Sequence, residues 1–295
     1  MANHRPVIIG GSNSVTLAKR VARAAHGEFI ALKVSRFPDG ETLVRISKKL
    51  QGRAVVIVNS TYPNANDALM EVALAVDAAK RGGALSVTAV LPYLAYMRQD
   101  TVFNPGEPLS ASVMARVLND ADRVIAVDPH LHRIRRLSDV FKARAESTTA
   151  NAVLAEYIRS HYRTAVVVGP DAESFQWART IADRIGLKAT ILRKTRFSAR
   201  RVVVRLAGAV VVKGHDVVIV DDMVSTGHTV AEAAKLAKRL GARKVHCVCV
   251  HGLFLGDAVR LLKRAGIRDI VSTNTVPGPF ARIDVSSLIA EAVYQ

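Results

Sequence analysis

Continuous apolar, β-branched runs separated by alanine-rich segments constrain the fold of this chain more than any other feature. They are VIIG at 7–10, AVVIV at 54–58, LSVTAVLPY at 85–93, DRVIAVD at 122–128, TAVVVGPD at 164–171, ATILRK at 189–194, DVVIVDD at 216–222 and KVHCVCVHG at 244–252. Strands without polar alternation are buried on both faces, as in parallel sheets covered by helices. The sequence therefore predicts an α/β protein with doubly wound, mostly parallel sheets.

The two halves of the chain resemble each other. VVIV occurs at 55–58 and at 217–220, each time three residues after a glycine, and each run leads into an alanine-rich helix ending in Lys-Arg. A chain of 295 residues also exceeds the length that one hydrophobic core usually serves. We therefore predict an internal duplication into two similar domains, residues 1–146 and residues 147–295.

Composition and charge narrow the class of protein. Lys and Arg total 42 against 25 for Asp and Glu, a net charge of +17 that favours phosphorylated or polyanionic partners. Aromatic residues make up only 5 %, which argues against stacking on single strands, so we expect no specific nucleic acid partner. No apolar run has the roughly 18 residues of a membrane helix and no secretory signal is recognised, so we expect a cytoplasmic protein without membrane association. The two cysteines, Cys247 and Cys249, alternate along one strand and are interpreted as buried core thiols.

The segment DDMVSTGHT at 221–229 carries the clearest chemical signal. It follows the buried run VVIV, and its Ser/Thr/Gly turn leads into a helix whose N-terminus can bind phosphate. The carboxylates of Asp221 and Asp222 can hold sugar hydroxyls, whereas the first copy has Asn59-Ser60 at that place, so the halves are predicted to differ in role. The alternative is an ordinary strand-to-helix turn with an Asp cap. The segment resembles the phosphoribosyl-binding loop of type I phosphoribosyltransferases.

Further motifs extend the resemblance over essentially the whole chain. They are, in order, RFPDGE at 36–41, PYLAYMRQD at 92–100, NPGEPLSA at 104–111, VDPH at 127–130, VGPDAES at 168–174, KTR at 194–196 and STNT at 272–275. In this order they resemble ribose-phosphate pyrophosphokinases, and more the shorter, archaeal-like members. The resemblance implies two type I phosphoribosyltransferase-like domains and transfer of the β,γ-diphosphate of ATP to the C1 hydroxyl of ribose 5-phosphate, with Mg²⁺.

The resemblance also implies roles for single residues. ATP would lie against the first domain, at Phe37, Asp39, Glu41, Arg98 and Gln99. Ribose 5-phosphate would lie in the second, with its hydroxyls at Asp221 and Asp222 and its phosphate at Ser225, Thr226, Gly227 and Thr229. Mg²⁺-linked groups would be His130 and Asp171, and the catalytic pair would be Lys194 and Arg196. Members of the family build their sites near subunit contacts, which implies a homo-oligomer, a dimer or larger.

Two other functions stay open at this point. A non-catalytic regulatory homologue that binds phosphoribosyl compounds, or RNA, and associates with active subunits is favoured by His228, which stands in the phosphate loop where glycine is usual. The presence of Lys194, Arg196, His130 and Asp171 argues against it. A phosphoribosyltransferase that transfers ribose phosphate to a base is the other alternative. It is disfavoured because the first domain would then have no function.

Overall fold

The computed structural model describes residues 5–131, 133–196, 202–206 and 211–295, and for residues 172–173, 192–196 and 202–206 it describes the backbone alone. The chain separates into two compact units. Unit 1 comprises Met1–Thr149, Thr275–Pro277 and Val285–Gln295, and unit 2 comprises Ala150–Asn274 and Gly278–Asp284. None of the helices within the described residues is long and apolar enough to cross a bilayer.

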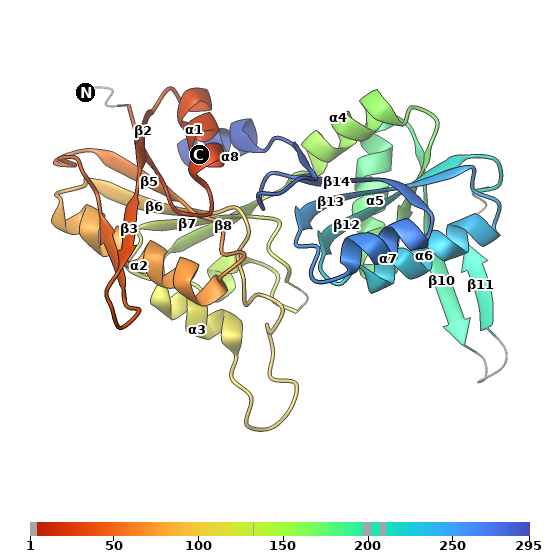
Figure 1. Ribbon diagram of the computed structural model, residues 1–295, viewed down its shortest axis with the longest axis horizontal. Coiled ribbons are helices and arrows are strands. Elements are labelled where there is room, and N and C mark those ends of the chain that lie inside the picture. Colours follow the sequence, from red (N-terminus) through yellow and green to blue (C-terminus); the bar gives the residue numbers. More distant parts are fainter. Residues whose placement is uncertain (1–4, 132, 197–201, 207–210) are drawn as a thin grey trace. The chain divides into compact units, whose positions relative to one another are not determined.

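Unit 1 contains a parallel sheet of six strands in the order β2-β1-β5-β6-β7-β8, with a separate antiparallel pair, β3 and β4 (Figure 1). Its elements are β1 (Val7–Gly10), α1 (Val15–Ala24), β2 (Glu28–Ala31), β3 (Lys33–Arg36), β4 (Thr42–Arg45), β5 (Ala54–Val58), α2 (Ala65–Arg81), β6 (Ser86–Leu91), α3 (Ser110–Val117), β7 (Arg123–Val127), the 3-10 helix η1 (Leu137–Asp139), β8 (Arg144–Thr148) and α8 (Ser286–Tyr294).

The central strands of unit 1 are buried on both faces, as their unbroken apolar sequence predicts. Val7, Ile9, Val55 and Ile57 point to one face, where they form a common core with α2 and α3. The intervening Ile8 is also fully buried, and α1 and α8 cover the other face. This double cover is the reason that the strands need no polar alternation.

The C-terminal helix α8 packs with unit 1, although the segment just before it, Gly278–Asp284, belongs to unit 2. Arg123 of β7 donates to the carbonyl oxygens of Ala292 (2.7 Å) and Val293 (3.2 Å), which are among the last carbonyls of α8. A guanidinium at a helix C-terminus satisfies carbonyls that lack an intrahelical partner. The domain limits 1–146 and 147–295 stay a prediction. Two contiguous domains with these limits would place α8 in the second domain, whereas α8 packs with unit 1.

Unit 2 contains a seven-stranded sheet in the order β11-β10-β9-β12-β13-β14-β15, parallel except for β11. Its elements are α4 (Asn151–His161), β9 (Val166–Gly169), α5 (Ala172–Ile185), β10 (Lys188–Arg196), β11 (Val202–Leu206), β12 (Asp216–Val224), α6 (His228–Arg239), β13 (Lys244–Gly252), α7 (Ala258–Arg264), β14 (Ile267–Thr273) and β15 (Ala281–Ile283).

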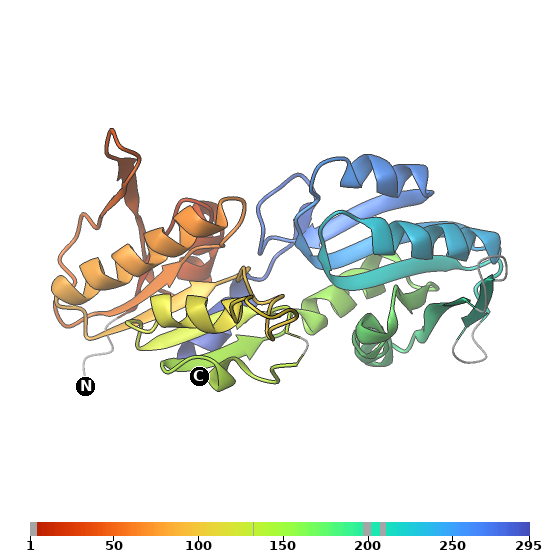
Figure 2. The ribbon, with the colours of Figure 1, turned by 90° about the horizontal axis from the view of Figure 1, so that it is seen from below.

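The second sheet is likewise covered by helices on both faces. Figure 2 shows α6 and α7 on one side of it and α4 and α5 on the other. Cys247 and Cys249 are buried free thiols in the core beneath α6, as predicted. The predicted fold class, α/β with two similar doubly wound domains and mostly parallel sheets, is confirmed.

Candidate active site

The strand order of unit 2 reverses between β9 and β12. The chain leaves β9 for β10 on one side, and β12 later pairs with β9 on the other. In open α/β sheets, ligands bind at such a reversal, outside the carboxyl ends of the strands. Asp171 follows β9, and Asp221 and Asp222 lie toward the carboxyl end of β12. Three of the predicted site residues therefore meet at this crevice.

The carboxylates at this crevice influence one another. Burial raises the pKa of Asp221 well above its ordinary value, and the negative charges of Asp222 and Asp171 raise this pKa further. The backbone N–H of Asp222 donates to Asp221 Oδ1 at 3.1 Å. Asp171 caps α5 by accepting from the Ser174 N–H at 2.9 Å. Three oxygen-rich groups in mutual repulsion form a place where hydroxyl donors or a hard cation would relieve the unfavourable charge.

The turn after β12 has the geometry expected of a phosphate loop. β12 ends at Val224, and the N-cap of α6 is Gly227, whose φ of +76° lies in the left-handed region. A Cβ on Gly227 would lie 3.3 Å from the Leu262 side chain, so glycine is needed for both conformation and space. The helix starts at His228, which is exposed together with Thr226 and Thr229. The N-terminus of α6 thus presents hydroxyls and N–H groups to an anion.

The predicted catalytic pair lies on a two-stranded extension of the second sheet. The pairing of β10 with β9 ends at Ile191, opposite Gly169, whereas β10 continues in antiparallel pairing with β11. Lys194 lies opposite Val204 and Arg196 opposite Val202. Lys194 is three residues past the last β9 pair, about 10 Å beyond the carboxyl end of β9. The side chains of Lys194 and Arg196 lie outside the described residues.

The equivalent reversal in unit 1, between β1 and β5, is filled by the protein itself. The carboxylate of Glu71 is buried there and accepts from the Ser12 N–H (2.8 Å), from Ser12 Oγ (2.6 Å) and from Asn59 Nδ2 (3.1 Å). A Cβ on Gly11 would lie 2.4 Å from Cγ of Asn59. This packing gives a physical reason for the different roles predicted from Asn59-Ser60, because the side chain of Glu71 already occupies the place.

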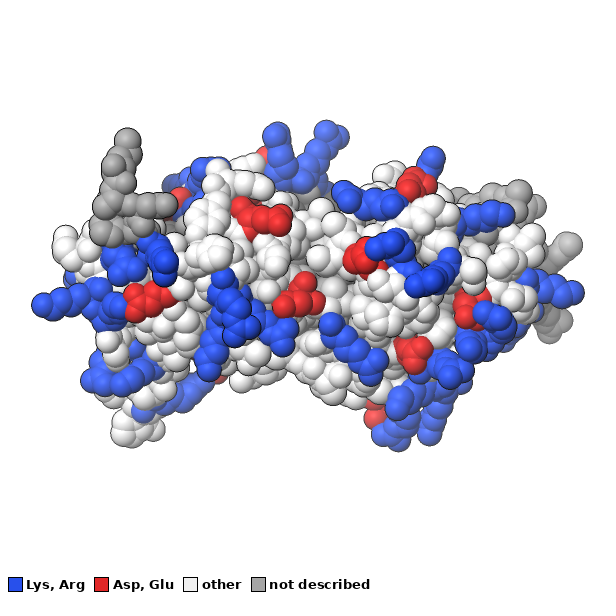
Figure 3. All heavy atoms as spheres, turned by 90° about the horizontal axis from the view of Figure 1, so that it is seen from above, with Lys and Arg blue, Asp and Glu red and all other residues white. Residues whose placement is uncertain are grey.

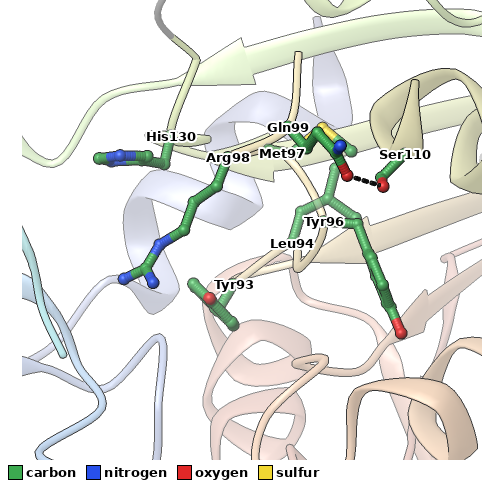
Figure 4. Close-up of a pocket in the computed structure, with 8 residues that line it drawn as sticks. All are labelled: Tyr93, Leu94, Tyr96, Met97, Arg98, Gln99, Ser110 and His130. Carbon is green, nitrogen blue, oxygen red and sulfur yellow. Dashed lines mark hydrogen bonds between the residues drawn. The ribbon is translucent and has the colours of Figure 1, made fainter. Parts of the chain in front are cut away.

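Unit 1 has instead a cavity of about 310 Å³ next to the carboxyl ends of β6 and β7 (Figure 4). Its lining residues are Tyr93, Leu94, Tyr96, Met97, Arg98, Gln99, Ser110 and His130. The structure thus brings together Arg98 and Gln99, predicted on the ATP side, with His130, predicted as a Mg²⁺-linked group. An exposed guanidinium, an imidazole and two tyrosines form a wall suited to a phosphorylated aromatic ligand.

Ser110 and Glu107 orient Gln99, and neither was predicted from the sequence as a site residue. Ser110 Oγ donates to Gln99 Oε1 at 2.5 Å (Figure 4), and Gln99 Nε2 donates to Glu107 Oε2 at 3.2 Å. Hydrogen bonds from Asn104, the largest cause, and from Phe103 and Gln99 lower the pKa of Glu107. Both residues lie in the motif NPGEPLSA, so the motif was the only sequence feature that pointed to them. The spacing of its residues does not reveal that this segment folds back onto Gln99.

The remaining predicted ATP residues, Phe37, Asp39 and Glu41, lie on the connection between β3 and β4 and do not line this cavity. This connection forms a β-turn, in which the Gly40 N–H donates to the Phe37 carbonyl at 2.9 Å and Gly40 has a φ of +95°. The ring of Phe37 is 47 % exposed. These three assignments stay predictions.

The predicted Mg²⁺ residues lie on different units, His130 on unit 1 and Asp171 on unit 2. Within the described part of the chain, no group of three or more His, Cys, Asp and Glu side chains is arranged to hold a metal ion. Mg²⁺ usually takes only one or two carboxylates and completes its shell with water and substrate phosphates. A single carboxylate such as Asp171 fits that mode of binding.

Comparison with known proteins decides the family. Residues 6–122 match the N-terminal domain of ribose phosphate pyrophosphokinase, and residues 138–278 match the phosphoribosyl transferase domain. The ribose-phosphate pyrophosphokinase of Methanopyrus kandleri is 37 % identical over 97 % of this chain and 98 % of its own length. Ribose-phosphate pyrophosphokinase 1 of Archaeoglobus fulgidus is 38 % identical over 97 % and 99 %. The chain belongs to the ribose-phosphate pyrophosphokinase family.

A solved structure agrees with this assignment. The phosphoribosylpyrophosphate synthetase of Mycobacterium smegmatis is 30 % identical and superposes with a TM-score of 0.85 over 98 % of both chains. The predicted resemblance, the two phosphoribosyltransferase-type domains and the activity of a ribose-phosphate pyrophosphokinase are therefore confirmed. The roles of single residues stay predictions.

Proposed function

We propose that this pyrophosphokinase transfers the β,γ-diphosphate of ATP to the C1 hydroxyl of ribose 5-phosphate, giving 5-phosphoribosyl 1-pyrophosphate and AMP. The observation that carries the proposal is the crevice of unit 2, where carboxylates and a Ser-Thr-Gly helix N-terminus lie together at the strand-order reversal. The carboxylates can accept hydrogen bonds from the sugar hydroxyls, and the helix N-terminus can bind the phosphate of the same sugar phosphate.

Ribose 5-phosphate would bind with its hydroxyls on Asp221 and Asp222 and its 5-phosphate on the loop that follows β12. Carboxylates accept hydrogen bonds from hydroxyls, and the raised pKa of Asp221 reflects an environment in which such donors are favourable. The phosphate would contact Ser225, Thr226, Gly227 and Thr229, where the helix dipole adds attraction.

ATP would bind at the cavity of unit 1. Arg98 would pair with phosphate oxygens, and Gln99, oriented by Ser110 and Glu107, would position the nucleotide. The ring of Phe37 would stack on the adenine, with Asp39 and Glu41 beside it on the same connection.

The transfer itself would depend on positioning and charge. Lys194 and Arg196 would neutralise the negative charge that grows on the transferred group, which is the usual contribution of cations in phosphoryl transfer. We assign Mg²⁺ to Asp171 on the ribose side and to His130 on the ATP side. When bound, Mg²⁺ supplies charge neutralisation to the phosphates.

The test is AMP formation from ATP that requires both ribose 5-phosphate and Mg²⁺, measured by chromatography of the nucleotides. Formation of ADP would indicate an ordinary kinase and would contradict the proposal. Tight binding of ribose 5-phosphate without turnover would favour a regulatory homologue. Transfer of ribose phosphate to a free base would favour a phosphoribosyltransferase.

We also propose a homo-oligomer, a dimer or larger, in the cytoplasm. The β3–β4 pair exposes Val34 (38 %) and Leu43 (45 %) in addition to Phe37, an apolar surface that a second copy could cover. The location follows from ATP as an intracellular donor. Light scattering at working concentration tests the assembly, and a fully active monomer would contradict it.

A further inference from the structure

The positive charge of unit 2 collects on the edge of the sheet opposite the candidate active site. Because β12, β13 and β14 are parallel, their amino ends share one edge. Six cations lie at this edge, on the segments that lead into the strands, on the first residues of the strands and on the C-terminal ends of α6 and α7. We call them the basic edge: Lys213, Lys238, Lys244, Lys263, Arg264 and Arg268. All except the half-buried Lys244 are exposed.

The segments of the basic edge are in direct contact. Cγ of Lys213 lies 3.0 Å from the position that a Cβ would take on Gly241, in the turn before β13. Cε of Lys238 lies 3.3 Å from the corresponding position on Gly266, in the turn before β14. Lys238 Nζ also donates to the carbonyl oxygen of Arg243 at 3.1 Å. The cations therefore form one continuous surface.

The two acids nearest this surface form their ion pairs with other residues, although Asp216 also feels the charge of Lys244. Asp216 is paired with Arg243, with Nε and Oδ1 2.8 Å apart, and Asp269 is paired with His246, with Nδ1 and Oδ2 2.7 Å apart. The six residues of the basic edge form no ion pair with any residue that the structure describes. On the face drawn in Figure 3, Lys and Arg likewise outnumber Asp and Glu.

Two ordinary explanations account for only part of this charge. Cations at helix C-termini are favoured by the helix dipole, which explains Lys238, Lys263 and Arg264 but not Lys213, Lys244 or Arg268. Attraction of phosphorylated substrates does not explain Lys213, Lys244 or Arg268 either, because the phosphate loop follows the opposite end of β12. A nine-residue strand separates the two ends by about 30 Å.

We propose that the basic edge binds the phosphate backbone of nucleic acid without reading its base sequence. Neighbouring strands lie about 4.8 Å apart, so the segments before β12, β13 and β14 span about 10 Å. That distance corresponds to roughly three phosphates of one strand. An acidic protein is a poorer match, because protein interfaces have apolar or aromatic centres and Val211 is the one exposed large apolar residue described beside this edge.

Fluorescence anisotropy of a labelled oligouridine RNA, titrated with the full-length protein, tests the proposal. We expect binding at low salt, with a log–log salt slope of about −2 for three phosphate contacts, so that affinity falls about 15-fold between 50 and 200 mM salt. Lys213→Glu, Lys263→Glu and Arg268→Glu, combined in one variant, should weaken binding at the lower salt by at least about tenfold and flatten the slope. Its AMP formation should equal that of the wild type.

The matched control reverses three exposed cations of unit 1, Arg5→Glu, Arg23→Glu and Lys49→Glu, and so changes the net charge equally. It should keep most of the RNA affinity. An equal loss in both variants would mean that net charge alone attracts RNA, and would overturn the proposal. So would an absence of binding by the wild type at about 50 mM salt. Neither outcome depends on which reaction the active site carries out.

Discussion

Gly227 tests whether the turn after β12 is the phosphate site, because its backbone conformation is unfavourable for any residue with a Cβ. Its φ is +76°, and a Cβ there would lie 3.3 Å from both Cγ and Cδ2 of Leu262. Gly214 provides the matched control, since its φ is +78°, nothing lies within 4 Å of its Cβ position, and it precedes the other end of β12.

The expected losses of stability for Gly214→Ala and Gly227→Ala follow from the surroundings of the two glycines. Placing alanine in the left-handed region costs about 1–2 kcal/mol, and Gly214→Ala should lower the free energy of unfolding by that amount. Gly227→Ala should lower it by about 1 kcal/mol more, because Leu262 must also move. Each kcal/mol should lower the melting temperature by roughly 2–4 °C for a domain of this size.

Steady-state kinetics separates the two variants. Gly227→Ala should raise the KM for ribose 5-phosphate roughly tenfold, equivalent to about 1.4 kcal/mol of lost binding, while the KM for ATP changes little. Gly214→Ala should leave both KM values at the wild-type level. A KM for ribose 5-phosphate that is the same in both variants within about twofold would refute the assignment of the phosphate to this turn.

Four further substitutions probe the rest of the site. Lys194→Ala should lower kcat by roughly 10²-fold with little change in ribose 5-phosphate affinity, whereas Asp222→Ala should mainly raise the KM for that substrate. Asp221→Asn should raise the melting temperature of the unliganded protein at pH 7, because burial and two carboxylates make its ionised form unfavourable. This gain should disappear as the pH falls below the ordinary aspartate pKa of 3.8, where both folded and unfolded states are protonated. Ser110→Ala should raise the KM for ATP several-fold with ribose 5-phosphate affinity unchanged, since it frees the Gln99 amide.

The buried strands were predictable from the sequence because each contains several apolar, mostly β-branched residues with little polar alternation. The runs at 7–10, 54–58 and 244–252 coincide with β1, β5 and β13. The edge strands were not, because their sequences are short and mixed. β8, for example, reads Arg-Ala-Glu-Ser-Thr and is held by parallel pairing with β7. Such pairing depends on a neighbour that local sequence does not reveal.

The candidate site was predictable where it depends on the ends of strands. Asp221 and Asp222 follow an apolar run, so their place at a ligand-binding edge follows from the fold class. The contacts of Glu71 were not predictable, since its partner Ser12 is 59 residues away in the chain. The same holds for Arg123, whose partners on α8 lie 169 and 170 residues further on. These interactions depend on packing of the whole unit.

In the proposed reaction a diphosphate moves intact from ATP to C1 of ribose 5-phosphate. Phosphorus-31 NMR of a reaction containing the protein, ATP, ribose 5-phosphate and Mg²⁺ observes donor and acceptor together. We expect AMP and a ribose 5-phosphate carrying a diphosphate at C1, in equal amounts and without ADP. Release of ADP, or AMP formed at the same rate when ribose 5-phosphate is omitted, would contradict it.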